Sequence, residues 1–79
     1  MKEFDLDYVK QHWEEAQSGE LVQTRHGEDV KLTSLDLSSE RSISGIAIFQ
    51  GEEVVVTWRM DGHYSPIHND DPNDLVIKE

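Results

Sequence analysis

Hydrophobic and polar residues follow two different periods along the chain. In residues 4–18 the apolar side chains recur at helical spacing, at Leu6, Val9, Trp13 and Ala16. This spacing predicts one amphipathic helix over about residues 5–18, which we expect to cover a sheet. Asp5 can cap the start of this helix, and Gly19 can end it in the left-handed conformation.

From Leu21 onward the period changes to two, which is typical of β-strands. We expect five strands, near residues 21–25, 30–37, 43–50, 54–60 and 74–78. The third is apolar on both faces from Ile46 to Phe49, which indicates a central position in the sheet. The parity of the apolar residues changes after Leu32, which predicts a β-bulge or bend near Thr33-Ser34.

The strongest local signal is the stretch from Val54 to Tyr64, where β-branched and aromatic residues run into Asp61-Gly62. An Asp-Gly pair favours a two-residue type I′ turn, so we expect a strand, a tight reversal and the start of another strand. Side chains alternate between the two faces of a strand. The expected core face consists of Val54, Val56, Trp58 and Met60.

Two more glycines have a predicted conformational role. Gly27 lies in a four-residue loop, residues 26–29, and is expected to take a positive φ there. Gly45 interrupts a strand and predicts a tight bend of a curled sheet. Together the elements predict a single α+β domain over residues 1–79, with an N-terminal helix on a curled five-stranded antiparallel sheet that resembles a small, partly open SH3-like barrel.

Composition narrows the function. The chain has 79 residues, a net charge of −10 from 17 acidic and seven basic residues, and no cysteine. Disulfides and thiolate metal sites are therefore excluded, and phosphate backbones and anionic lipids repel the chain. With no apolar run of the roughly 18 residues that cross a bilayer and no secretion signal at the N-terminus, we expect a cytoplasmic protein.

Four short motifs resemble a known group of proteins: Ala16-Gln17-Ser18-Gly19, Val22-Gln23-Thr24-Arg25-His26-Gly27, Trp58-Arg59-Met60-Asp61-Gly62 and Asp74-Leu75. The chain is similar to small, largely uncharacterised proteins of gut Bacteroidetes and their phages or mobile elements. Those proteins share an A-x-x-G-x-x-V-x-T-R-x-G opening, a D-G hairpin and a terminal D-L. They usually have Asp at the position of His26, and their N-terminal segment is often shorter. The resemblance implies a curled antiparallel sheet and no particular activity.

The densest polar cluster has the residue types of a zinc or calcium site: His63, His68, Asp70, Asp71 and Asp74. The ligand spacing of known zinc helices and calcium loops is absent, and residues 69–74 are typical of a solvated turn, so we expect no metal. Ser65, His63 and Asp74 have the types of a nucleophilic triad, but three common residues in one loop are weak evidence. We therefore expect no catalytic residues, no cofactor and no enzymatic activity.

The leading hypothesis is a small acidic protein-interaction module with an unidentified, basic protein partner. The candidate interaction residues are Trp13, Arg25, Arg59, Tyr64, Asp70 and Asp71. Arg, Trp and Tyr are enriched at interface hot spots, whereas Arg25 and Arg59 also suit cross-strand ion pairs. The alternatives are a nucleic-acid-binding β-barrel, which the charge makes unfavourable, and an acidic decoy for a nucleic-acid-handling protein. A homodimer through a strand edge or the helix flank is a further expectation.

Overall fold

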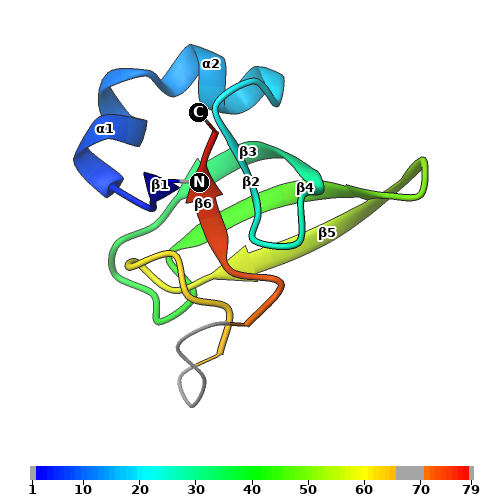
Figure 1. Cartoon of the computed structure of the whole chain (residues 1–79). Helices are drawn as coiled ribbons and strands as arrows, with labels where there is room; N and C mark the ends of the chain where they lie inside the picture. The colour runs from blue at the N-terminus through cyan, green and yellow to red at the C-terminus, as the bar shows by residue number, and fades with distance from the viewer. Residues whose placement is uncertain (1, 66–70, 79) are drawn as a thin grey trace.

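The structure is a computed structural model that describes residues 2–65 and 71–78. These residues form two short helices and one curled antiparallel sheet of six strands, in the order β1-β6-β2-β3-β4-β5 (Figure 1). The elements are β1 (Lys2–Glu3), α1 (Leu6–Gln11), α2 (Trp13–Ser18), β2 (Val22–Thr24), β3 (Asp29–Leu35), β4 (Ile43–Phe49), β5 (Glu52–Trp58) and β6 (Leu75–Ile77).

The predicted α+β class and curled antiparallel sheet are confirmed, and the sheet is a half-barrel rather than a closed one. All five predicted strands are present, with bounds that differ by one or two residues. The predicted strand number is wrong because β1 adds a sixth. It pairs with β6 through Lys2↔Ile77 and Glu3↔Val76, and two charged residues give no alternating apolar pattern in the sequence.

The single predicted helix is also wrong, because the chain leaves helical geometry at His12, which has φ −119° and ψ 39°. The predicted ends are confirmed: the Asp5 carboxylate accepts from the Tyr8 N–H at 3.2 Å, and Gly19 has φ +90°. Val9 and Ala16 are fully buried, and α2 packs against β3. In the described residues, neither helix has the length and apolar character to cross a membrane.

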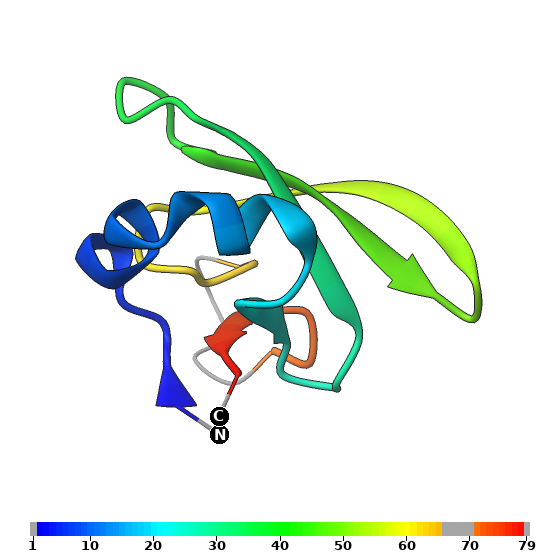
Figure 2. The same ribbon diagram turned by 90° about the horizontal axis from the view of Figure 1, so that it is seen from above.

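Strand β5 is buried only at its end. Trp58 is fully buried, as expected, and Val56 packs partly against the core. The expected burial of Val54 and Met60 is wrong, because they are 41% and 52% exposed. Figure 2 shows the reason: the β4–β5 hairpin projects beyond the rest of the sheet, so the first half of β5 has no layer to pack against.

The predicted turn at Asp61-Gly62 differs in type. Of these two residues only Gly62 has a positive φ, +86°, so this is not a type I′ turn. The Arg59 carbonyl accepts from the Gly62 N–H at 2.8 Å, and the Arg59 N–H donates to the His63 carbonyl at 3.0 Å. These two bonds close a three-residue loop. The two positive φ values of a type I′ turn occur instead at Gln50-Gly51, between β4 and β5.

The chain after this loop does not return along β5. In the described part of the chain β5 pairs with β4 alone, so the predicted partner strand starting at His63 is absent there. By contrast, β4 lies between β3 and β5, and its predicted central position is confirmed. Strand β5 is therefore an edge of the sheet.

Two further predictions concern the β3–β4 pair: a bulge near Thr33-Ser34 and a bend at Gly45. The β3–β4 register shifts between Leu32 and Ser34, which confirms the bulge. A Cβ on Gly45 would lie 2.9 Å from the Lys31 carbonyl oxygen and 3.2 Å from the Trp58 ring. Glycine at this position therefore lets β3, β4 and the core tryptophan approach closely.

Candidate functional site

The outer edge of β5 presents unpaired backbone groups. The two-residue loop Gln50-Gly51 is flanked by the pair Phe49↔Glu52, which in such a hairpin exchanges both hydrogen bonds. Bonded and non-bonded pairs then alternate along the ladder. The N–H and C=O groups that point away from β4 are consequently those of Glu53, Val55 and Thr57.

The first half of β5 is exposed as well as unpaired. Residues 52–55 are all exposed, and Val55 is the most exposed large apolar residue of the described chain, at 77%. Two valines thus lie beside two glutamates on an edge strand. Edge strands of stable monomers are usually protected by covering segments or by inward-pointing charges. Strand β5 has charged residues only at its start, Glu52 and Glu53.

A cavity of about 300 Å³ runs along the same edge. It is lined by residues 54–58 on one side, by Thr24, Tyr64 and Asn73 on the other, and by Phe49 and Arg41. Side chains alternate between the two faces of a strand, and a cavity that borders five consecutive residues of β5 follows the length of this edge strand. We call this cavity the edge groove.

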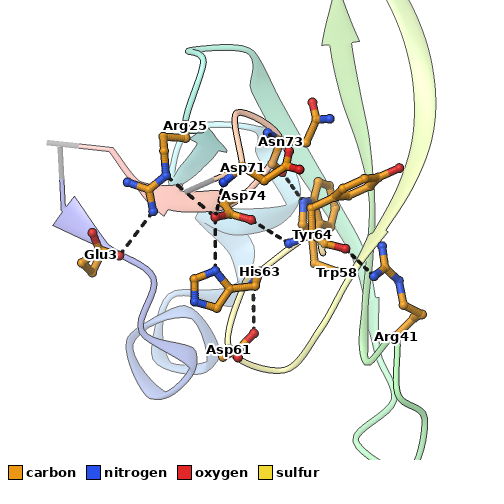
Figure 3. Close-up of polar contacts among 10 residues, drawn as sticks. All are labelled: Glu3, Arg25, Arg41, Trp58, Asp61, His63, Tyr64, Asp71, Asn73 and Asp74. Atoms are coloured by element: carbon orange, nitrogen blue, oxygen red, sulfur yellow. Dashed lines mark hydrogen bonds and ion pairs between the residues drawn. The ribbon is translucent and has the colours of Figure 1, made fainter. Parts of the chain in front are cut away.

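The far side of the groove is held by the buried carboxylate of Asp74, which is 1% exposed (Figure 3). Its Oδ1 accepts from the Tyr64 N–H at 2.7 Å, and its Oδ2 accepts from the Asp71 N–H at 3.1 Å. The His63 Nδ1 lies 3.1 Å from Oδ2, and the Arg25 Nε lies 3.9 Å from the same oxygen. Together these contacts fix the position of Tyr64 relative to β6.

Two further side chains, those of Trp58 and Arg41, join the far side to β5. The buried Trp58 indole donates to the Asn73 carbonyl at 2.7 Å. Arg41 donates from Nη2 to the Thr57 carbonyl at 2.6 Å, from Nε to the Thr57 hydroxyl at 3.1 Å and from Nη1 to the Tyr64 carbonyl at 2.5 Å. Its guanidinium also lies 5.1 Å from the centroid of the Tyr64 ring. The groove is therefore pre-formed, and its Thr57 end is covered by Arg41.

No protein-family model, curated protein or solved structure matches the chain significantly. The resemblance indicated by the short motifs therefore stays a prediction, and the site has to be interpreted from its own geometry.

Of the predicted interaction residues that the structure describes, only Tyr64 lines the edge groove directly. Arg25 and Asp71 contribute from behind through Asp74, and Arg25 also pairs with Glu3 at 3.6 Å. Asp70 lies outside the described residues. Prediction from residue type thus identified one residue that lines the groove, Tyr64, and two that contact Asp74 behind it, Arg25 and Asp71.

Trp13 and Arg59 lie elsewhere on the described surface. Trp13 lines a depression between α1, α2 and the bulge of β3, whereas Arg59 lines one beside the β3–β4 loop. Sequence reasoning missed Arg41, whose only signal was the scarcity of bases in the chain. It also missed Asp74 as the central acceptor.

The polar cluster that was weighed as a metal site and the candidate triad meet only in part. In the described residues no group of three or more His, Cys, Asp or Glu side chains could hold a metal ion, and His68 and Asp70 lie outside them. His63 and Asp74 do meet, as the triad arrangement required. An aspartate bonded to Nδ1 orients an imidazole. In this site that pair adds to the support of Tyr64.

A second, exposed pair lies in the β2–β3 loop. This loop has three residues, Arg25–Gly27, rather than the predicted four, with Thr24 N–H bonded to the Glu28 carbonyl and Gly27 at φ +112°. The His26 Nδ1 lies against the Glu28 carboxylate. This contact raises the pKa of His26 and lowers the pKa of Glu28, chiefly through their mutual hydrogen bond.

We expect the His26–Glu28 pair to stabilise the loop between the ordinary pKa values of the two groups, 4.5 and 6.5. The contribution is lost as pH rises through the raised pKa of His26, and lost as pH falls through the lowered pKa of Glu28. An NMR titration of the His26 ring should therefore give a pKa above 6.5, and Glu28→Gln should return it towards 6.5. Glu15→Gln is the control that leaves it unchanged, and a wild-type value at or below 6.5 would contradict the pairing.

Proposed function

We propose that the chain is a small, non-enzymatic protein-interaction module and that its binding surface is the edge groove with the exposed half of β5. The observation that carries the proposal is the 77% exposure of Val55 on an unpaired edge strand beside a pre-formed groove. Exposed apolar surface beside ordered polar contacts is typical of interaction sites. We also propose that the curled sheet is a small, partly open SH3-like barrel.

Charge favours a basic protein as the partner. The chain carries −10, and Glu52 and Glu53 are both exposed next to the groove. Complementary charge speeds the encounter of two proteins and helps to select the partner. A basic, nucleic-acid-handling protein would satisfy this requirement, as the decoy hypothesis also expects.

The described basic residues argue against direct binding of nucleic acid. Arg25 and Lys78 lie against carboxylates, Arg41 donates to carbonyl and hydroxyl groups, and Lys2 lies over the Tyr8 ring. Four of the seven bases are thus engaged within the fold, and a phosphate backbone needs several that are gathered and accessible.

An affinity capture with immobilised wild-type chain and two variants tests the proposal. Val55→Ser removes apolar surface from the groove edge, and Leu37→Ser removes it from another exposed site of 47% exposure. We expect a protein of the native host that is retained by wild type and by Leu37→Ser, but about tenfold less by Val55→Ser, since a hot-spot truncation costs at least about 1.4 kcal/mol. Equal retention by all three, or no specific capture, would contradict it.

A further inference from the structure

We infer that the occupant of the edge groove is an extended, basic segment of the partner, added to the sheet as a strand beside β5. This inference rests on the proposed function and specifies how the partner is recognised. Its basis is the coincidence of three features on one edge: outward backbone groups, a groove and exposed acidic side chains.

The backbone groups define the shape of the ligand. Glu53 and Val55 together direct two N–H and two C=O groups away from β4, as the ladder register requires. Only an extended segment can pair with donors and acceptors at this spacing, which is how β-strand addition works in other recognition domains. Alternate side chains of such a segment would point into the groove, and the others would point away from it.

Arg41 limits the length of the added strand. Its Nη2 already donates to the Thr57 carbonyl, the next outward acceptor after Val55, and its Nη1 donates to Tyr64. The free edge therefore ends at Val55, and the other limit is the Gln50-Gly51 turn. An edge with four available groups favours a short segment and weak, reversible binding.

A second copy of the chain fits this edge less well. Two-fold pairing centred on Val55 would place Glu53 of each copy opposite Thr57 of the other, where the Arg41 side chain lies. Two-fold pairing centred on Val54 avoids Thr57, but it brings the exposed glutamates of both copies to the same short ladder. Each copy also brings a net charge of −10. A basic segment meets none of these obstacles, since it needs only Glu53 and Val55 and is attracted by Glu52 and Glu53.

The test uses synthetic peptides and NMR chemical-shift mapping on the 79-residue chain. The probe is Lys-Val-Lys-Val-Lys-Val-Lys, and its matched controls are the same peptide with Glu in place of Lys and the same peptide N-methylated at alternate residues. We expect the lysine probe to shift the amides of residues 52–57. The glutamate peptide, and the form methylated on the edge-facing amides, should bind at least about tenfold more weakly.

Two variants separate the backbone of Val55 from its side chain. Val55→Pro removes the outward N–H and leaves the ladder to β4, because proline is tolerated where the N–H faces away from the sheet. Val55→Thr keeps the N–H and the β-branched shape. We expect Val55→Pro to weaken the lysine probe about tenfold and Val55→Thr to weaken it less than threefold. Should Val55→Pro not fold, the methylated peptide still tests the backbone pairing.

Equal binding of the methylated and unmethylated probes would overturn strand addition, and so would unchanged binding by a folded Val55→Pro chain. Binding of the glutamate peptide as tight as that of the lysine probe would overturn the basic segment. A concentration-dependent dimer with protected Glu53 and Val55 amides would show that a second copy takes the edge, and would also overturn the inference. None of these results removes the proposed function, which fails if no partner is specifically captured or if the captured partner is indifferent to Val55→Ser.

Discussion

Replacing Trp58 with Ala is expected to reduce the free energy of unfolding by about 3–5 kcal/mol. Trp58 is the largest fully buried side chain of the described residues, and its indole N–H donates to the Asn73 carbonyl. The substitution leaves a cavity under β4 and an unpaired carbonyl beside β6. A domain of this size has a total stability of about 4–12 kcal/mol, so this loss is a large fraction of the total.

Urea denaturation followed by far-UV circular dichroism measures this loss. Trp58→Phe separates most of the packing from the hydrogen bond, because a smaller aromatic ring remains and the N–H donor is lost. We expect a cost of about 1–3 kcal/mol for the unpaired Asn73 carbonyl and the smaller ring. Trp13→Ala is the matched control, since Trp13 is only partly buried, and should cost less than Trp58→Ala. A loss below about 1 kcal/mol for Trp58→Ala would contradict its place in the core.

Asp74→Asn is expected to destabilise the chain by about 2–4 kcal/mol, because it removes a buried charge with several partners. The new amide would place an NH₂ group against the N–H of Tyr64 or of Asp71, where the carboxylate accepts from both. It would also leave the Arg25 guanidinium without its buried counter-charge. The substitution therefore weakens the contacts that hold the far side of the edge groove, in addition to lowering stability.

The measurement is again urea denaturation, joined to the NMR shift of the Tyr64 amide. That amide should move strongly in Asp74→Asn, since its acceptor at 2.7 Å is the mutated carboxylate. Asp36→Asn is the control, because the exposed Asp36 accepts from the Ser38 N–H within a turn of the β3–β4 loop, and should change stability by less than about 0.5 kcal/mol. An Asp74→Asn chain as stable as wild type, with an unmoved Tyr64 amide, would show that the buried contacts contribute nothing.

Local signals in the sequence identified most of the elements. Alternation located five strands, and Asp5 and Gly19 marked the helix ends. These are properties of a few neighbouring residues, so they can be read without knowing the fold.

What depends on distant partners could not be predicted. The helix breaks at His12 although the apolar period continues through it, and β1 exists only because β6 lies beside it. The Asp61-Gly62 pair predicted a type I′ hairpin turn, yet the turn of this type is at Gln50-Gly51, where it joins β4 to β5. Turn composition gives the tendency to reverse, whereas the strand that follows is selected by the rest of the sheet.

In the candidate site, too, features with a local signal were predicted and features that depend on distant residues were not. Tyr64 was predicted from its residue type, but Val54 was assigned to the core because period two says which residues share a face and not whether a layer covers that face. Arg41 gave no local signal, since its role depends on contacts 16 and 23 residues away in the sequence. The edge groove is therefore a product of the topology.

The most direct test of the central claim, a free β5 edge, is amide hydrogen exchange of the unbound chain measured by NMR. The structure predicts alternation within a single strand: the amides of Val54 and Val56 are bonded to β4 and exchange slowly, whereas those of Glu53 and Val55 face outward and exchange at least about tenfold faster. Equal protection of Val55 and Val56 would show that the edge is already covered and would contradict the account.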